Sequence, residues 1–311
     1  MTTLAPEPPA PAPLAVQQAA RRPRPAWLGK LTPYWLVLPG WLWLAIFFVI
    51  PVVVMLSVST MTGDIASGFK QTFRFSNYSD AWSAYHVQFV RSLVYGGIAT
   101  GLCLLLGYPV AFWIAFRGGA HKSSLLFLIL LPFFVSFVIR TQSWNFILSD
   151  NGMVVSRLRD WGWVGQNFHI LQTPAAVIGG LTYNFIPFMI LPIYVALERI
   201  DLSLLEAAAD LYASRTLAFL RIVFPLSIPG VFAGVLLTFV PVSSDYVNAS
   251  ILGGSTGTTM IGNIIQTQYF TNLNYPAAAA LSFILMAILL VGVFIYARLL
   301  GTDEVLEAAT R

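Results

Sequence analysis

Two ionisable residues lie in long apolar stretches, where a charge is costly and usually functional. Asp245 comes four residues after Pro241, and a proline inside a helix removes one backbone hydrogen bond and can kink the helix. A carboxylate in a kinked helix, with Tyr246 beside it, could line a path for a cation. Asp245 could equally cap a helix end at the outer membrane interface, and the residues alone leave both interpretations open.

Arg140 is the second such charge, and it lies one helical turn from Ser136 and from Trp144. A guanidinium that faces lipid is unfavourable, so this side chain should face protein or water. It could pair with Asp245, with Asp150 or with backbone carbonyls. We expect a structural ion pair, and the alternative is that Arg140 repels or gates a cation.

Polar groups also interrupt the apolar stretch at about 175–197. Tyr183, Asn184 and Pro187 place hydrogen-bonding groups and a helix break near its middle. Such groups can contact a solute in transit, although they more often hold membrane helices together. The candidate residues of a substrate pathway are therefore Asp245, Tyr246, Arg140, Trp144, Tyr183 and Asn184.

The sequence predicts neither an enzyme nor a metal site. Residues 253–257 fit G-x-S-x-G, but that pattern needs a strand–turn–helix context and a histidine partner, and a flexible Gly-rich loop is expected instead. The three histidines are too far apart in sequence for metal-ligand spacing. A phosphate-binding loop needs Gly-Lys before Ser or Thr, whereas Gly29 and Lys30 precede Leu31. Since this pattern is missing, the energy for any transport must come from another polypeptide or from an ion gradient. We also expect no cofactor on this chain.

The composition predicts a membrane protein. Of the 311 residues, 57% are hydrophobic and only 10% are charged, whereas a soluble domain has about 25% charged residues. Long apolar runs without alternation favour helices over a barrel, because each helix pairs its own backbone groups in hydrocarbon. The net charge of +4 is scattered along the chain and forms no patch for nucleic acid.

Six apolar segments are long enough to cross a hydrocarbon core of about 30 Å as helices. They cover about 34–58, 90–116, 124–148, 175–197, 228–249 and 277–300. An even number of crossings leaves both termini on one side, which would hold eleven of the 17 Lys and Arg residues, so both termini are expected in the cytoplasm. We predict an all-α polytopic membrane helix bundle with about six transmembrane helices.

The predicted organisation has three parts. Residues 1–30 form a disordered, Pro/Ala-rich cytoplasmic tail, residues 31–301 the transmembrane domain, and residues 302–311 a short cytoplasmic tail. Within the domain, the cytoplasmic loop at 198–230 is unusual for its length and for its helix-forming residues.

The loop at 198–230 predicts two short helices. Asp201 or Ser203 can cap the first helix, and Glu206 would complete a capping box if Ser203 is the N-cap. A second helical stretch should stop at Pro225 and Pro229. A helix lying on the membrane surface would carry Lys and Arg on its polar face. The first stretch carries acidic residues instead, which favours a protein partner.

This loop resembles the EAA motif of binding-protein-dependent ABC importer permeases. Glu206, Ala207 and Ala208 match the opening of the motif, Ile222 and Pro225 match its closing residues, and Tyr212 stands where the family usually has Gly. In that family the motif forms coupling helices, which dock into a groove on the ATP-hydrolysing subunit. The resemblance implies that ATPase coupling falls to Glu206, Ala207, Ala208, Asp210, Tyr212, Ile222 and Pro225.

The resemblance also implies a fold, a location and partners. The fold is the type I ABC importer permease (MetI-like) architecture, in the inner membrane of a bacterial cell. The partners are a second permease subunit, which we expect to be a different chain, a cytoplasmic ABC ATPase dimer that uses ATP, and an extracytoplasmic solute-binding protein.

Further segments resemble the spermidine/putrescine permease branch of this family. They are residues 132–152, 178–208, 245–254 and 260–270. The branch implies that the solute is a small cation, a polyamine such as spermidine or putrescine. The alternatives are a permease for another small solute delivered by a binding protein, and a secondary transporter that works without an ATPase.

Overall fold

The computed structural model describes residues 37–299, and the predicted tails at 1–30 and 302–311 lie outside the described residues. The chain divides after Val53 into two units, which are treated separately. The described part of the first unit is an apolar helical stretch, which belongs to the candidate span Val37–Ser59.

The described elements, in chain order, are η1 (Ala45–Val49), α2 (Ile50–Ser59), β1 (Met61–Asp64), β2 (Gly68–Gln71), α3 (Ser76–Arg117), η2 (Gly119–His121), α4 (Lys122–Leu130), η3 (Leu131–Phe134), α5 (Phe137–Leu148), α6 (Met153–Asp160), α7 (Pro174–Glu198), α8 (Leu202–Asp210), α9 (Arg215–Ala218), η4 (Phe219–Val223), α10 (Phe224–Ser244), η5 (Ala249–Gly253), α11 (Ile261–Gln266), η6 (Thr267–Thr271) and α12 (Tyr275–Leu299). Strand β1 pairs antiparallel with β2, and Met61 lies opposite Gln71.

Within residues 37–299, five helices are long and apolar enough to cross a membrane, and a bent pair of helices is the sixth candidate. The predicted continuous span at 124–148 is therefore wrong, because the pair Gly119–Phe134 and Phe137–Asp160 is bent by 87°. Pro132 has no N–H to continue α4, and Val135 and Ser136 take extended conformations between the two halves.

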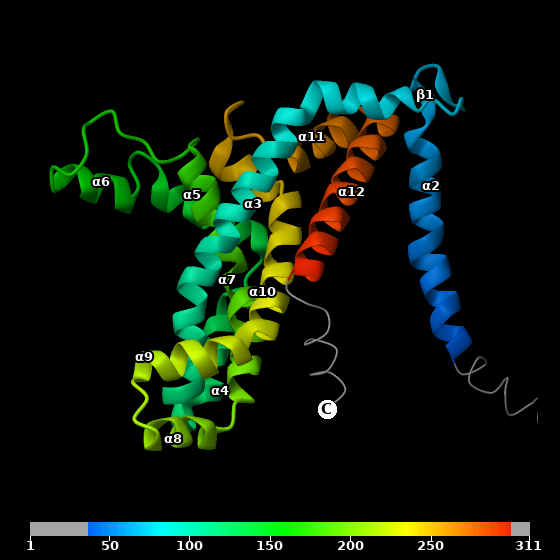
Figure 1. The fold of residues 1–311 in the computed structure, drawn as a ribbon. Helices are drawn as coiled ribbons and strands as arrows, with labels where there is room; N and C mark the ends of the chain where they lie inside the picture. The colour runs from blue at the N-terminus through cyan, green and yellow to red at the C-terminus, as the bar shows by residue number, and fades with distance from the viewer. Residues whose placement is uncertain (1–36, 300–311) are drawn as a thin grey trace, which may run out of the picture. The chain divides into compact units, whose positions relative to one another are not determined.

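In the second unit, α3, α7 and α10 run side by side (Figure 1). Small residues allow this approach. A Cβ on Gly230 would lie 2.5 Å from the Cβ of Ala196, and one on Gly234 would lie 2.8 Å from the sulfur of Met189, so α10 touches α7 at both glycines. Lipid gives helices no hydrophobic reason to associate, so such close van der Waals packing contributes much of their cohesion.

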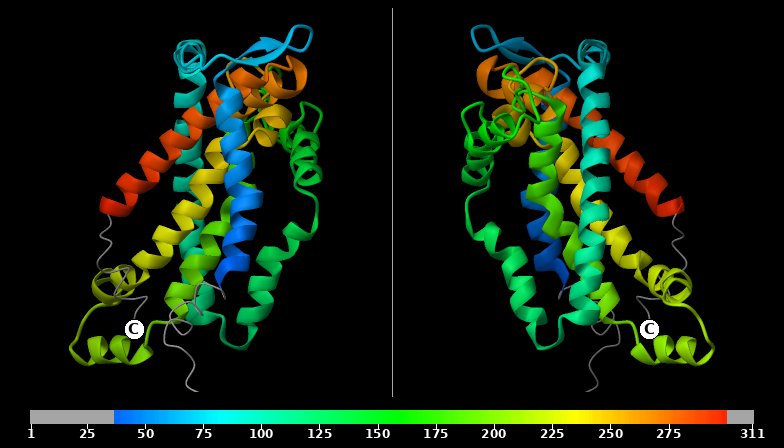
Figure 2. Two further views of the ribbon diagram at one scale, coloured as in Figure 1. Left: turned by 90° about the vertical axis from the view of Figure 1, so that its right-hand side faces the viewer. Right: turned by 90° about the vertical axis from the view of Figure 1, so that its left-hand side faces the viewer.

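Each end of this bundle carries its own group of short elements. Helices α8 and α9 lie at one end of α7 and α10, and the β1–β2 hairpin and α11 lie at the opposite end (Figures 1 and 2). The segment between the first two predicted spans thus forms the hairpin and the first turns of α3.

Candidate functional site

Helix α8 begins at an aspartate cap. The backbone N–H of Ser203 donates to Oδ1 of Asp201 over 2.9 Å, so Asp201 is the N-cap and the proposed capping box of Ser203 with Glu206 is wrong. Hydrogen bonds from Ser203 hold the pKa of the Asp201 carboxyl below its usual range. An ionised carboxylate at this end also suits the positive pole of the helix.

Helix α8 has a distinct inner and outer face. Leu205 packs against the core cluster of α3 and α7, and Ala208, one turn further on, is buried. Glu206 and Asp210, four residues apart on the other face, are exposed. The acidic face therefore points away from the bundle that holds the helix.

Helix α8 ends in a Schellman motif that has a tyrosine where glycine is usual. The N–H of Tyr212 donates to the carbonyl of Ala209, and the N–H of Ala213 donates to that of Ala208, both over 2.9 Å. Tyr212 has a φ of 59°. The left-handed turn that glycine would favour is thus kept without glycine, and the Tyr212 side chain is 98% exposed beside Leu211, which is 81% exposed.

The second helix of the loop does not stop at the prolines. Helix α9 is capped by Ser214, whose Oγ accepts from the N–H of Leu217 over 3.3 Å, and the helical run then continues to Ser244. The prediction that Pro225 and Pro229 end it is wrong. Pro225 follows the π-helical turn η4, where the backbone hydrogen-bond register changes and the N–H of Phe224 donates to the carbonyl of Phe219, so the proline is accommodated inside the continuous run. Ile222 lies in η4, just before Pro225.

An ion pair joins two elements next to this loop. The ammonium of Lys122, the first residue of α4, donates to both carboxylate oxygens of Glu198, the last residue of α7, over 3.0 and 2.9 Å. Both side chains are partly exposed, so the pair contributes about 0–1 kcal/mol.

A buried polar network lies beyond the far end of α10. Asp245 follows the last residue of α10, is 8% exposed, and its Oδ2 accepts from the backbone N–H of Asn248 over 2.8 Å and from its Nδ2 over 3.1 Å. Oδ1 of Asn248 accepts from Nδ2 of Asn184 on α7 over 3.0 Å. Nδ2 of Asn184 also donates to Oγ1 of Thr141 on α5 over 3.0 Å. The network therefore ties three segments together.

Asp245 thus caps the turn after α10. Of the two interpretations that the sequence left open, this geometry matches the capping one. Tyr246 is not in the network, since its side chain is 44% exposed and its carbonyl accepts from Asn263. Sequence reasoning missed Asn248 and Thr141. The spacing of Asn248, three residues after a carboxylate, is a turn signal that could have indicated its bond to Asp245.

Arg140 forms no ion pair among residues 37–299, so the expected structural ion pair is wrong there. Its guanidinium instead lies over the Phe133 ring, 4.6 Å from the centroid, and 5.7 Å from that of Phe137. Asp150 is 3.8 Å from Arg159 instead. The aromatic rings follow the break after α4, and no sequence pattern shows that the break turns them toward Arg140.

Trp144 and Tyr183, the two remaining candidates for the substrate pathway, contact each other. The rings of Trp144 and Tyr183 meet edge to face with centroids 5.2 Å apart. This contact joins α5 to α7 one turn from Arg140 on one helix and next to Asn184 on the other.

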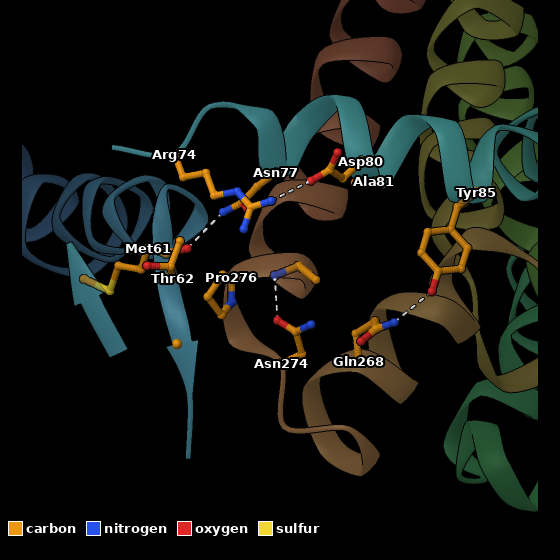
Figure 3. Close-up of a pocket in the computed structure, with 12 residues that line it drawn as sticks. Met61, Thr62, Arg74, Asn77, Asp80, Ala81, Tyr85, Gln268, Asn274 and Pro276 are labelled. Carbon is orange, nitrogen blue, oxygen red and sulfur yellow. Dashed lines mark hydrogen bonds and ion pairs between the residues drawn. The ribbon is translucent and has the colours of Figure 1, made fainter. Parts of the chain in front are cut away.

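A polar pocket of about 340 Å³ lies at the end opposite α8 (Figure 3). The hairpin, the start of α3 and the start of α12 line it. Arg74 pairs with Asp80 over 3.3 Å, and Gln268 donates to the Tyr85 hydroxyl over 2.8 Å. The carboxylate of Asp80 is thus already paired with the guanidinium of Arg74. The pocket therefore has no strong preference for a positively or a negatively charged ligand.

The G-x-S-x-G run is part of a loop. Ser255 bonds to the hydroxyl of Thr258 over 3.0 Å and donates to the carbonyl of Gln172 over 3.3 Å. No hydrogen bond joins Ser255 to a histidine in the described part of the chain, and no group of three metal-ligating side chains lies there.

These features define a class of protein: a membrane subunit with several candidate membrane-spanning helices and a helical loop whose acidic face is exposed. The chain belongs to the family described as binding-protein-dependent transport system inner membrane component, whose model matches residues 25–300. It is the multi-pass inner-membrane permease of an ABC transporter, in which a separate subunit hydrolyses ATP and a periplasmic protein binds the solute.

Particular relatives narrow the comparison. The chain is 37% identical over 257 residues to the spermidine/putrescine transport system permease protein PotB of Haemophilus influenzae, covering 82% of this chain and 90% of the relative. It is 35% identical over 269 residues to PotB of Escherichia coli K12, covering 85% and 98%. A bacterial alginate ABC transporter shares the fold, with a TM-score of 0.67 at 19% identity over 89% of this chain and 98% of that one.

Proposed function

We propose that this permease forms half of the path by which a polyamine such as spermidine or putrescine is imported. The observation that carries the proposal is the likeness to PotB over more than four fifths of the chain, at 35–37% identity. The solute-binding protein of the same transport system should then bind spermidine or putrescine in calorimetry. Binding of a sugar or an anion in their place would contradict the polyamine assignment and leave the importer assignment standing.

Coupling to the ATPase is assigned to the loop of α8 and α9. The bundle holds α8 by Leu205 and Ala208, so its acidic face is free to meet another protein. ATP binding would bring the two ATPase subunits together, move the loops and open the transport path to the outside. The same role extends to Ala207, Tyr212, Ile222 and Pro225, which complete the motif.

Charge reversal on the acidic face tests this role. Glu206→Lys should abolish solute-stimulated ATP hydrolysis and uptake in proteoliposomes while insertion into the membrane stays normal. Asp160→Lys, which reverses a negative charge at an exposed position on α6, is the matched control and should retain both activities. Full coupling in Glu206→Lys would remove the loop from the mechanism.

A secondary transporter is the rival candidate, and one measurement separates the two. Purified permease without its ATPase should move no solute across liposomes down an ion gradient. Uptake under those conditions would contradict an ATP-driven mechanism.

The assembly and topology are proposed from the same family. The second permease subunit is a different chain, so native mass spectrometry of the purified complex should find two permease masses. Both termini lie in the cytoplasm, so a reporter that is active only in the cytoplasm should be active when it is fused to either end of the chain. A single permease mass, or a periplasmic terminus, would contradict the respective statement.

A further inference from the structure

A cavity of about 490 Å³ lies where the break after α4 meets α7. Its wall combines aromatic rings with the three polar side chains of Ser136, Arg140 and Asn184, and the rings are those of Phe133, Phe134, Phe137, Phe185 and Phe188. Ligand pockets in proteins have this size and this mixture of apolar walls with few polar groups.

Arg140 occupies an aromatic surface that suits any cation. The faces of Phe133 and Phe137 carry negative charge density, which attracts cations within about 6 Å of the ring centroid. The guanidinium is buried, its Nε has no hydrogen-bond partner, and it has no carboxylate within ion-pair distance among the described residues. A buried charge with so few partners is poorly stabilised where it lies.

Asn184 offers an acceptor in the same wall. It is 1% exposed, and its Oδ1 has no hydrogen-bond partner. The network fixes which end of the amide is free. An ionised Asp245 can only accept, so Asn248 must turn its Nδ2 toward Asp245 and its Oδ1 toward Asn184. Asn184 must then donate through Nδ2, which leaves its carbonyl oxygen as the free group.

We propose that this cavity holds an ammonium group of the transported amine. The ammonium lies against the faces of Phe133 and Phe137 and donates a hydrogen bond to Oδ1 of Asn184. Arg140 holds the same faces while the cavity is empty, and the amine must displace it. Asp245 is then a positioning residue, which acts through Asn248 to aim Asn184. This inference rests on the proposed polyamine transport.

The charge on Arg140 therefore competes with the solute, and this gives an unusual prediction. Arg140→Met keeps a long side chain and removes the cation, so the purified complex in nanodiscs should bind radiolabelled spermidine about threefold or more tightly than the wild type, given the strength of buried cation–π contacts. Arg140→Lys keeps the cation and should bind as the wild type does.

Loss of the proposed contacts should have the opposite effect. Asn184→Ala and Phe137→Leu should each weaken spermidine binding about threefold or more. Phe146→Leu makes the same change on α5 at a residue that does not line the cavity, so it should leave binding unchanged. The uncharged diol 1,4-butanediol should not compete with spermidine for any variant.

Each outcome separates this inference from the function on which it rests. Equal or weaker spermidine binding by Arg140→Met would overturn it, and that is the result expected if a carboxylate of the neighbouring permease holds Arg140. Polyamine uptake by the wild-type complex would still stand. If the wild type neither imports nor binds putrescine or spermidine, the proposed function falls and the inference falls with it.

Discussion

Replacing Tyr212 by glycine should stabilise the end of α8. A non-glycine residue in the left-handed region costs about 1–2 kcal/mol, and Tyr212 has a φ of 59°. Glycine would relieve this cost but would lose about 0.5–1 kcal/mol more conformational entropy on folding. The turn at the end of α8 should therefore be about 0.5–1 kcal/mol more stable in Tyr212→Gly than in the wild type. This difference makes local opening of the turn about two- to fivefold less favourable.

Hydrogen–deuterium exchange at the turn measures this gain. The amide of Ala213 closes the motif on the carbonyl of Ala208, so after correction for intrinsic rates it should exchange about two- to fivefold more slowly in Tyr212→Gly. Tyr212→Ala is the matched control, because it removes the exposed ring but keeps a Cβ in the left-handed region. Its exchange should resemble that of the wild type.

Equal exchange in the glycine and alanine variants would refute the reasoning, since strain at this position would then be absent. The same pair of variants reports on the ring itself. Both lack it, so if the tyrosine ring contacts the ATPase, solute-stimulated ATP hydrolysis should fall in both. A fall in one variant alone would point to the backbone of the turn.

Two further predictions concern packing and capping. Gly230→Ala should lower the stability of the complex in detergent by about 1–3 kcal/mol, measured by thermal unfolding, because its Cβ would lie 2.6 Å from the backbone carbonyl oxygen of Pro192. Gly97→Ala is the control, because its Cβ would meet open space, and it should leave the thermal stability unchanged. Asp201→Ala should speed amide exchange in α8 at neutral pH, because Ser203 loses its acceptor. The pKa of Asp201 is lowered in the folded state, so its contribution is complete above the pKa of the unfolded chain and is lost as the pH falls through the lowered value. The difference between wild type and variant should therefore vanish in acid, and a difference that persists there would mean that the cap does not depend on charge.

The long helices could be predicted from the sequence because their signal is local. An apolar run of about 20 residues in a chain with few charges has no alternative to a membrane helix. The break after α4 also has a local cause, Pro132, but prolines do not always break helices. Four more lie inside α7 and α10 without ending them, at Pro187, Pro192, Pro229 and Pro241. Only the surrounding packing decides between these outcomes, so the broken span could not be predicted.

The surroundings of the buried polar groups were the least predictable part. A carboxylate and a guanidinium in one apolar bundle suggest an ion pair, yet Asp245 accepts hydrogen bonds from Asn248 and Arg140 lies against aromatic rings. The groups that surround Asp245 and Arg140 depend on how three helices meet. The periodicity of a single segment carries no information about that packing. The loop at 198–230 shows the opposite case, because its caps are local and Asp201 was among the two predicted N-caps.

The ion pair of Lys122 with Glu198 has a mechanical consequence. Helix α4 begins at this pair and leads into Phe133, so a short connection joins the start of the loop at 198–230 to the wall of the cavity of about 490 Å³. The connection is held by partly exposed charges, which dissolved salt weakens. Force entering at α8 would therefore reach the cavity through a contact that ions can loosen, and the efficiency of transport should depend on the ionic strength at that face of the membrane.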